Sequence, residues 1–428
     1  MLSERQPWRG YEDRVRVRDA PQEFKVHTGV YTDPSIFEEE MRTIFEHTWV
    51  YVAHESEIAS PGDFRTSAVG RMPVIVTRDA DGAVHVLLNV CRHRGSVVCR
   101  EERGNASHFR CPYHNWVYSN DGTLRGIPDR GGYPEGWGKD IEGLVPASRV
   151  ASYRGMIFAS FNDSIEDLAD YLGPLKTYVD DWFDHAPAGR MKLRTPYRSV
   201  YPANWKFQLE NSTDGWHARY VHESALKTMH RFETRNPVAG WPGCTRGFDQ
   251  GHGVLERLRN DIPPDVAGPF QEHMALLERR YGPERAERLY VRRHITIFPN
   301  VQLMEFKLRV IQPVAVDRTI VYEYPVELEG VPDSVNQAIF RRISLEVSVS
   351  SGSFVSGFVN ADDAEIFARV QTGLKAARME WLDMSRGLHR EVRQPGGEIV
   401  GDNTDEVPQR AMYRAWVRLM GSGQEKQP

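Results

Sequence analysis

The stretch NVCRHRGSVVC, residues 89–99, places Cys91 two residues before His93, and a second stretch, CPYHNW at residues 111–116, repeats the pairing. Both stretches follow short runs of β-branched and aromatic residues, so we expect them to be loops, where the backbone can bend around an ion. Four cysteines in a chain of 428 residues without an apolar export segment do not suggest a disulfide framework. This spacing therefore predicts a metal centre held by two loops.

Two kinds of metal centre fit these residues. Zinc is one, because two cysteines and two histidines in tetrahedral array form a common structural site. Zinc fingers, however, usually take both cysteines from one segment and both histidines from another, whereas each loop here supplies one of each. A Rieske [2Fe-2S] cluster takes two sulfurs on one iron and two imidazoles on the other. Arg92, Arg94 and Arg100 suit its negative charge, and Gly95 lets backbone N–H groups approach its sulfides. We therefore interpret the cluster ligands as Cys91, His93, Cys111 and His114.

The composition narrows the class of protein. Apolar residues make up 40% and charged residues 26% of the chain, as in a globular enzyme, and the length suggests two or three domains. A net charge of −5 without a basic cluster argues against nucleic-acid binding. We find no apolar run long enough for a membrane span, and the polar start MLSERQPWRG has no signal-peptide character. We expect a cytoplasmic protein.

A second group of candidate ligands lies in NWKFQLENSTDGWHARYVHES, residues 204–224. His217 and His222 are five positions apart, and side chains at this spacing in a continuous helix point about 140° apart. Both can reach one metal only if the helix ends, or carries a π-type bulge, between them. Two unrelated surface histidines are the alternative. Asp214, three residues before His217, could orient a metal-bound imidazole through its second ring nitrogen.

A distant carboxylate would complete a 2-His-1-carboxylate triad, in which non-haem iron oxygenases keep positions open for O2. Asp362 and Asp363, in SGFVNADDAEIF, follow an apolar, Gly-marked segment that suits such a site. We expect them at a helix start, where Asp commonly serves as N-cap, so one can cap while the other binds iron. Asp214 then offers a short electron path between His114 and His217, because each imidazole has a spare ring nitrogen.

The two groups of ligands indicate the organisation of the chain. Short strands and Gly-bearing turns such as Asp81–Gly82 fill residues 49–161, and a helix is predicted from Ser35, with Ser35 as its N-cap. The predicted fold class is α+β, a small all-β Rieske domain inserted before a larger catalytic domain with an antiparallel sheet flanked by helices. The expected divisions are residues 1–47, an N-terminal helical segment on the catalytic domain, 48–160, the Rieske domain, and 161–428, the mononuclear-iron domain. Later elements are predicted as helices at 164–182, at 274–294 with a break at Gly282–Pro283, and at 362–384, and as strands at 300–316 and 319–328.

The chain resembles the α subunit of a Rieske-type aromatic-ring-hydroxylating oxygenase over nearly its whole length. The motifs that carry this resemblance are CRHRG, CPYHNWVYS, NWKFQLEN, DGWHARYVH and GFVNADD, and they occur in the order of that family. The segments VYTDPSIFEEEMRTIFEHTWVYVAHESEI, ASYRGMIFAS and FPNVQLMEF are similar to benzoate and anthranilate 1,2-dioxygenases. Trp216 departs from the family, which usually has Tyr before the first iron histidine.

This resemblance implies roles for named residues. It implies a cluster on Cys91, His93, Cys111 and His114, and an iron on His217, His222 and Asp363 with Asp214 as the bridge. It also implies a homotrimer in which Asp214 of one chain connects to His114 of the next, with a small β subunit in an α3β3 assembly in many members. Electrons would come from NADH through a separate reductase, in some members with a ferredoxin.

The implied reaction is NADH-driven cis-dihydroxylation of an aromatic ring by O2, with an aromatic carboxylate as the expected substrate. Alternatives with the same two centres are monooxygenation, O-demethylation, or hydroxylation of another aromatic such as an aniline or a salicylate. A zinc-stabilised binding protein is the alternative outside the enzymes. A pure electron carrier is disfavoured, because the β domain alone would serve that purpose.

Apolar and cationic residues near the metal motifs are candidates for the substrate pocket. Arg309, in KLRVIQP, could bind a carboxylate with two parallel hydrogen bonds, although its strand position favours a solvated or ion-paired Arg. The apolar candidates lie on regular elements, where an ordinary core position is the alternative. They are Phe207, Met304, Phe306, Phe354 and Phe358.

Overall fold

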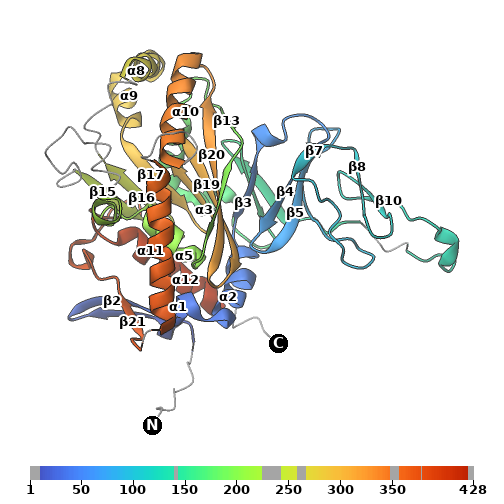
Figure 1. Ribbon diagram of the computed structural model, residues 1–428, viewed down its shortest axis with the longest axis horizontal. Coiled ribbons are helices and arrows are strands. Elements are labelled where there is room, and N and C mark those ends of the chain that lie inside the picture. The colour runs from blue at the N-terminus through green and yellow to red at the C-terminus, as the bar shows by residue number, and fades with distance from the viewer. Residues whose placement is uncertain are drawn as a thin grey trace, which may run out of the picture. The chain divides into compact units, whose positions relative to one another are not determined.

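The computed structural model describes residues 10–138, 143–223, 242–257, 267–347, 356–376 and 378–422, and Figure 1 draws its ribbon. The chain divides into two compact units. One unit is Phe45–Tyr171, and the other joins Met1–Ile44 to Leu172–Pro428. The Cys/His loops at residues 89–99 and 111–116 lie in the first unit, and both histidines of the second group lie in the other.

The unit Phe45–Tyr171 consists of three antiparallel sheets, which confirms the predicted all-β domain. Their strand orders are β6-β5-β4-β7, β11-β12-β3 and β10-β9-β8. The predicted turn at Asp81–Gly82 joins β5 to β6, and glycine suits it because φ of Gly82 is 87°. The strands are β3 Val50–His54, β4 Asp63–Val69, β5 Met72–Arg78, β6 Val84–Leu88, β7 Arg103–Asn105, β8 His108–Arg110, β9 Val117–Ser119, β10 Leu124–Gly126, β11 Arg149–Tyr153 and β12 Met156–Ser160.

The other unit is built on a ten-stranded antiparallel sheet. Its strand order is β13-β20-β19-β18-β17-β16-β15-β23-β22, and β14 also pairs with β20. The predicted strand region 300–316 is a hairpin, because Glu305 adopts a φ of 46° between β18 and β19. These strands are β13 Met191–Leu193, β14 Tyr197–Tyr201, β15 Gly243–Gly247, β16 Gly253–Arg257, β17 Arg292–Ile297, β18 Val301–Met304, β19 Lys307–Ala315, β20 Arg318–Leu328, β22 Val392–Arg393 and β23 Ile399–Asp402, with a separate sheet of β1 Val15–Asp19, β2 Gln22–His27 and β21 Trp381–Asp383.

The N-terminal helix differs from the prediction in its cap and its length. α2 spans Pro34–Glu40, and its N-cap is Asp33 rather than Ser35, because the Asp33 carboxylate accepts from the backbone N–H of Ser35. Pro34 suits the first helical position, where no N–H is needed, so the cap is Asp33, two residues earlier than predicted. Met41–Phe45 follow as a π-helical turn.

Proline interrupts two other predicted helices. The break at Gly282–Pro283 is confirmed, since α8 ends at Tyr281 and α9 begins at Pro283. The region 164–182, predicted as one helix, is divided by a 3-10 turn at Gly173–Leu175, because Pro174 cannot donate the hydrogen bond that a continuous helix needs. The helices are α1 Gly29–Thr32, α3 Leu168–Leu172, α4 Lys176–Phe183, α8 Ala267–Tyr281, α9 Pro283–Leu289 and α10 Asp333–Val347.

The helix predicted for residues 362–384 starts and ends earlier than expected. α11 spans Ser356–Ala376 and is the long vertical helix in Figure 1. Beyond it, Trp381–Asp383 form β21, which pairs with β2, so the apolar residues after α11 belong to a strand. A last helix, α12 at Val407–Ser422, contacts β15 and β16 and was not predicted.

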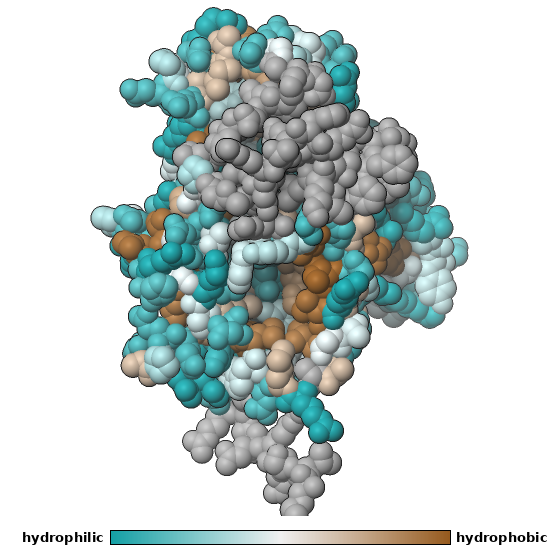
Figure 2. Space-filling view, turned by 60° about the vertical axis from the view of Figure 1, so that its left-hand side comes forward, coloured by the Kyte–Doolittle hydropathy of each residue, from teal (hydrophilic) through white to brown (hydrophobic). Residues whose placement is uncertain are grey.

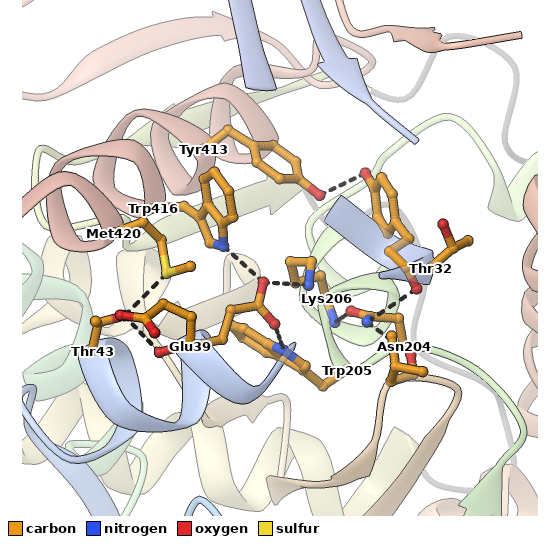
Figure 3. Close-up of polar contacts among 12 residues, drawn as sticks. Thr32, Glu39, Thr43, Asn204, Trp205, Lys206, Tyr413, Trp416 and Met420 are labelled. Atoms are coloured by element: carbon orange, nitrogen blue, oxygen red, sulfur yellow. Dashed lines mark hydrogen bonds and ion pairs between the residues drawn. The ribbon is translucent and has the colours of Figure 1, made fainter. Parts of the chain in front are cut away.

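α5, Trp205–Ser212, carries the first part of the second candidate site and is anchored by buried polar side chains. Asn204 caps it by accepting from the Lys206 backbone N–H. Lys206 and Glu40 are both fully buried and their charged atoms lie 2.6 Å apart. Figure 3 shows the indoles of Trp205 and Trp416 directed at the same carboxylate, with N–H donors 2.8 and 2.7 Å from Glu40 oxygens. Residues from α2, α5 and α12 are thus joined at one ion pair.

A second buried cluster fixes the other end of α5. The hydroxyls of Tyr31 and Tyr413 lie 2.9 and 2.6 Å from Oε1 of Glu210. Burial raises the pKa of Glu210 to about 7. α1, α12 and α5 are therefore connected through the hydrogen bonds of Glu210 as well as through the Glu40–Lys206 pair.

Replacing Lys206 with Met should destabilise this unit strongly. The substitution leaves the Glu40 carboxylate buried without its counter-charge, and breaking a buried pair in this way costs about 3–5 kcal/mol. We expect a lower midpoint of guanidinium unfolding, followed by fluorescence. Lys192→Met, at a side chain that is 56% exposed, is the control. An unchanged midpoint for Lys206→Met would show that the pair does not hold α5 in place.

On the face drawn in Figure 2, polar and charged residues cover most of the surface and hydrophobic residues form limited patches. Within the described residues, no helix has both the length and the apolar character needed to cross a bilayer.

Candidate metal centres

The two Cys/His loops bring like side chains together. Sγ of Cys91 and Sγ of Cys111 are close enough to influence each other's pKa, and the rings of His93 and His114 have centroids 4.5 Å apart. The first loop reverses at Gly95, whose φ is 71°, and Gly95 N–H donates to the Cys91 carbonyl. The loops therefore present two sulfurs side by side and two imidazoles side by side.

This pairing of like atoms distinguishes between zinc and an iron–sulfur cluster, the two kinds of centre that the sequence left open. In a tetrahedral zinc site with bonds of about 2.0–2.3 Å, all four ligand atoms lie within about 4.6 Å of one another. Among the described residues, which include all four of these side chains, the only group of three possible ligands within 4.8 Å lies elsewhere in the chain. The loops thus match a dinuclear cluster, with sulfur at one iron and nitrogen at the other, better than a single zinc.

The surroundings of the loops fit an iron–sulfur cluster. Nδ1 of His93 is buried without a hydrogen-bond partner, as expected for an atom that binds metal. Burial opposes ionisation of Cys111, but the backbone N–H groups of Tyr113 and His114 outweigh it and hold the pKa of this thiol below its usual value. Trp116 stacks on His93 with an interplanar angle of 4°. These contacts stabilise negative charge on sulfur and shield the imidazole.

Tyr118 belongs to this site, although no motif in the sequence indicated it. Its hydroxyl lies 3.2 Å from Sγ of Cys91 and accepts from the Arg92 backbone N–H at 3.1 Å. Because that N–H occupies the hydroxyl as an acceptor, the Tyr118 O–H can donate to the sulfur. Only the fold places Tyr118, on β9, beside the loop that starts at Cys91.

The second group of histidines lies around a very short helix. α6 spans only Ala218–Val221, with His217 at its N-cap and His222 at its C-cap. His222 has left the helical conformation, with φ −97° and ψ 24°. The helix therefore ends before the second histidine, which is one of the two conditions under which both rings can face one metal.

His217, His222 and Asp363 form one compact group. One nitrogen of each ring and a carboxylate oxygen of Asp363 all lie within 4.8 Å of one another. Oδ1 of Asp363 is 3.8 Å from Nε2 of His217 and 3.3 Å from Nε2 of His222. Asn211 Nδ2 donates to the same Oδ1 at 3.0 Å. Two imidazoles and a carboxylate around one point match the facial triad that binds non-haem iron.

The sequence predicted Asp362 and Asp363 at a helix start, but the structure places them inside a helix. α11 begins at Ser356, so Asp362 and Asp363 lie in its second turn, where a carboxylate cannot cap. Asp has a lower helix propensity than most residues, so two in succession inside a helix call for another explanation. The contacts of both side chains with His222 provide one.

Asp214 lies on the side of His217 away from Asp363. Its Oδ2 is 3.5 Å from Nδ1 of His217, and its Oδ1 accepts from the Trp216 backbone N–H. Burial disfavours the charge, but the His217 ring and these N–H groups outweigh burial and hold the pKa of Asp214 below its usual value. Asp214 is therefore ionised at neutral pH and accepts hydrogen bonds.

The loop that carries Asp214 is held by a neighbouring loop. A Cβ on Gly215 would come within 1.8 Å of the Asn403 carbonyl oxygen, so only glycine fits there. Trp216, the departure from the family, is 41% exposed, and the Arg386 guanidinium lies 3.8 Å from its ring centroid. Arg386 in turn donates to the Thr404 carbonyl. The bulkier ring thus packs against an arginine at the surface.

The candidate carboxylate-binding arginine is already occupied. Arg309 is 2% exposed, and its Nε and Nη2 both lie within 2.8 Å of Oε1 of Glu323. Its Nη1 donates to Ser212 Oγ at 3.0 Å. Of the two states that strand position suggested, the structure has the ion-paired one, and this guanidinium is not available to a substrate.

The apolar pocket candidates do not form one wall. Phe207 stacks on Tyr31 at 4.7 Å, inside the core beside α5. Phe306 packs against His185 and lines a small, partly open pocket to which no residue of the triad contributes. Met304, 9% exposed, pairs with His294 in the sheet. Phe354 and the side chain of Phe358 lie outside the described residues.

Comparisons with known proteins agree with both centres. Residues 48–151 match the Rieske [2Fe-2S] domain family, and residues 184–422 match the ring hydroxylating alpha subunit catalytic domain. The chain is 34% identical to the 2-halobenzoate 1,2-dioxygenase large subunit of Burkholderia cepacia, and 33% identical to the anthranilate 1,2-dioxygenase large subunit of Acinetobacter baylyi, each over 87% of this chain and 82% of the relative. A naphthalene 1,2-dioxygenase structure superposes with a TM-score of 0.83 at 27% identity, covering 93% of this chain and 92% of the other.

Proposed function

We propose a substrate class and an electron route from the premise that this chain belongs to the α subunits of Rieske ring-hydroxylating dioxygenases. The protein is thus a non-haem iron oxidoreductase, with a Rieske cluster and a mononuclear iron as its cofactors. Oxygenases of this family are oligomeric and work in multicomponent systems with reductase and ferredoxin partners. Which residues serve the cofactors, and which substrate is hydroxylated, are our proposals.

The cofactor assignments rest on the geometry of the two sites. The cluster would be held by Cys91, His93, Cys111 and His114, and the iron by His217, His222 and Asp363. When bound, the cluster supplies electrons one at a time, and the iron activates O2 beside the substrate. His217 would use Nε2 for the iron, while its Nδ1–H faces Asp214, which fixes the tautomer.

Asp214 is the proposed route between the centres. Its carboxylate contacts His217 through Oδ2 and is partly exposed, at 30% of its side chain, so a second imidazole can approach from outside. In the proposed homotrimer, or α3β3 assembly, that imidazole is His114 of a neighbouring chain. The Asp214 carboxylate would then lie between one ring of each centre.

The proposed substrate is an aromatic carboxylate. The observation that carries this proposal is the 34% identity to a 2-halobenzoate dioxygenase over 87% of the chain, together with the similar identity to an anthranilate dioxygenase. Both names describe benzoic acids. Since Arg309 is paired with Glu323, the cation that meets the substrate carboxylate must be another group.

Turnover with ¹⁸O2 tests this proposal. The purified protein, with a family reductase and NADH, should convert benzoate, 2-chlorobenzoate or anthranilate into a product that initially contains two labelled oxygens. Benzene, at the same concentration, is the neutral control and should react much more slowly. One labelled oxygen per product would mean monooxygenation, and preferential attack on neutral arenes or anilines would reject the aromatic acid.

Tyr118→Phe should lower the reduction potential of the cluster. The hydroxyl donates to Cys91 sulfur, and such a bond stabilises the more negative, reduced cluster. A net hydrogen-bond contribution of about 1 kcal/mol corresponds to about 40 mV for one electron. Redox titration followed by EPR measures the shift. Tyr133→Phe, at a ring that stacks on Trp137, should leave the potential unchanged, and an equal shift in both variants would contradict a specific role for Tyr118.

A further inference from the structure

Both histidines of the candidate iron site lie between two carboxylates. Each ring directs Nε2 toward Oδ1 of Asp363. On the opposite side, Nδ1 of His217 lies 3.5 Å from Asp214, and Nδ1 of His222 lies 3.4 Å from Oδ2 of Asp362. Asp362 is therefore placed at Nδ1 of His222 in the same way that Asp214 is placed at Nδ1 of His217. The two aspartates belong to different segments of the chain.

The position of Asp362 within α11 indicates that its side chain has a role other than stabilising the helix. It lies in the second turn of α11, where it cannot cap the helix and where Asp is a poor helix former. Its side chain is 22% exposed, so it is neither a core residue nor a freely solvated one. Among the described residues, the polar side-chain contact of its carboxylate is with His222.

We propose that Asp362 is a positioning residue that holds the His222 imidazole in the orientation and tautomer needed to bind iron, while Asp363 is the ligand. This inference rests on the proposed assignment of His222 and Asp363 as iron ligands. The sequence left open which of the two neighbouring aspartates binds iron. In this proposal Asp363 is the ligand beside Nε2 of His222, and Asp362 positions the ring at Nδ1.

The chemistry follows from the two ring nitrogens. A neutral imidazole has one N–H and one lone pair, so a proton held on Nδ1 leaves the lone pair of Nε2 for the metal. The Asp362 carboxylate accepts from Nδ1–H and so favours this tautomer. It also fixes the plane of the ring, because Nδ1 and Nε2 are then directed at consecutive residues of one rigid helix.

Metal affinity tests this role without relying on turnover. Protein with an intact cluster and an emptied iron site is titrated with Co(II) by equilibrium dialysis, for the wild type and for Asp362→Ala and Asp362→Asn. We expect Asp362→Ala to bind Co(II) about 10–100-fold more weakly, the usual effect of removing such a partner. Asp362→Asn should recover part of this loss, because its amide oxygen still accepts from Nδ1–H.

Two controls separate the possible failures. Glu365→Gln removes one charge from an exposed position of the same helix and should bind Co(II) like the wild type. His222→Ala should lose the site. If His222→Ala loses the metal while Asp362→Ala retains wild-type affinity, the positioning role is wrong and the ligand assignment stands. If His222→Ala also binds normally, the assignment itself is wrong. Equal weakening in Asp362→Ala and Asp362→Asn with lowered thermal stability would reduce Asp362 to a structural role.

Discussion

Replacing His217 with Ala is expected to reduce hydroxylation of an aromatic acid to less than about one hundredth of the wild-type rate. His217 supplies one of only three side-chain atoms that converge on the candidate iron position among the described residues. Removing even an outer partner of a metal ligand commonly costs 10–100-fold in affinity or activity, so the loss of a ligand itself should cost more.

The same variant should keep its cluster. The four Cys/His side chains belong to the unit Phe45–Tyr171 and His217 to the other unit, so acid-labile sulfide and the visible absorption of the cluster should be unchanged while total iron falls. His389→Ala, at an exposed histidine of the same unit as His217, is the control. Full activity in His217→Ala, or loss of sulfide together with iron, would contradict two separate centres.

Asp214→Ala should have an effect of similar size for a different reason. Asp214 contacts Nδ1 of His217 rather than the candidate metal position, so we expect iron to be retained at a substantial fraction of its wild-type occupancy. Transfer from the reduced cluster should nevertheless slow by about a hundredfold or more, because the hydrogen-bonded link between imidazoles is lost. Stopped-flow absorption of the cluster measures the transfer.

The conservative variant shows which property of Asp214 matters. Asp214→Asn keeps an acceptor oxygen but removes a charge that this structure favours, since the pKa of Asp214 is held below its usual value. We expect it to transfer electrons faster than the Ala variant and more slowly than the wild type. Asp249→Asn, at an exposed aspartate, is the control. Wild-type transfer in Asp214→Ala would reject the proposed route.

The chemistry of this chain could be predicted from its sequence because metal ligands are few and chemically distinctive. The four candidate ligands in the β loops could be found from the spacing of Cys and His in the sequence. The structure places the two sulfurs together and the two imidazoles together. The requirement that the helix end between His217 and His222 also came from geometry alone, and α6 ends there. Asp-Gly turns and a Gly-Pro break are local effects of backbone chemistry and were predicted correctly.

The errors came from interactions that the sequence does not display. Asp362 and Asp363 were assigned to a helix start because an apolar, Gly-marked segment precedes them, yet α11 begins at Ser356. α12 was missed because packing on β15 and β16 stabilises this helix, and the sequence alone does not show that packing.

Arg309 illustrates the same limit for charges. Its strand position predicted a solvated or ion-paired Arg, but its partner is Glu323 on β20, and the register that brings them together is tertiary information. Tyr118 and Asp362 likewise act through residues distant in the chain. A single sequence gives no indication of such neighbours.

One measurement tests most directly whether the cluster serves oxygen chemistry on an aromatic acid. The enzyme is reduced, freed from its reductase, and mixed with O2 in the presence or absence of benzoate. We predict that the cluster is oxidised rapidly only with benzoate present. One cis-diol should form per oxidised cluster, because the diol requires two electrons and the mononuclear Fe(II) would supply the second. Oxidation at the same rate in both mixtures, or oxidation with benzoate and no diol, would contradict the account.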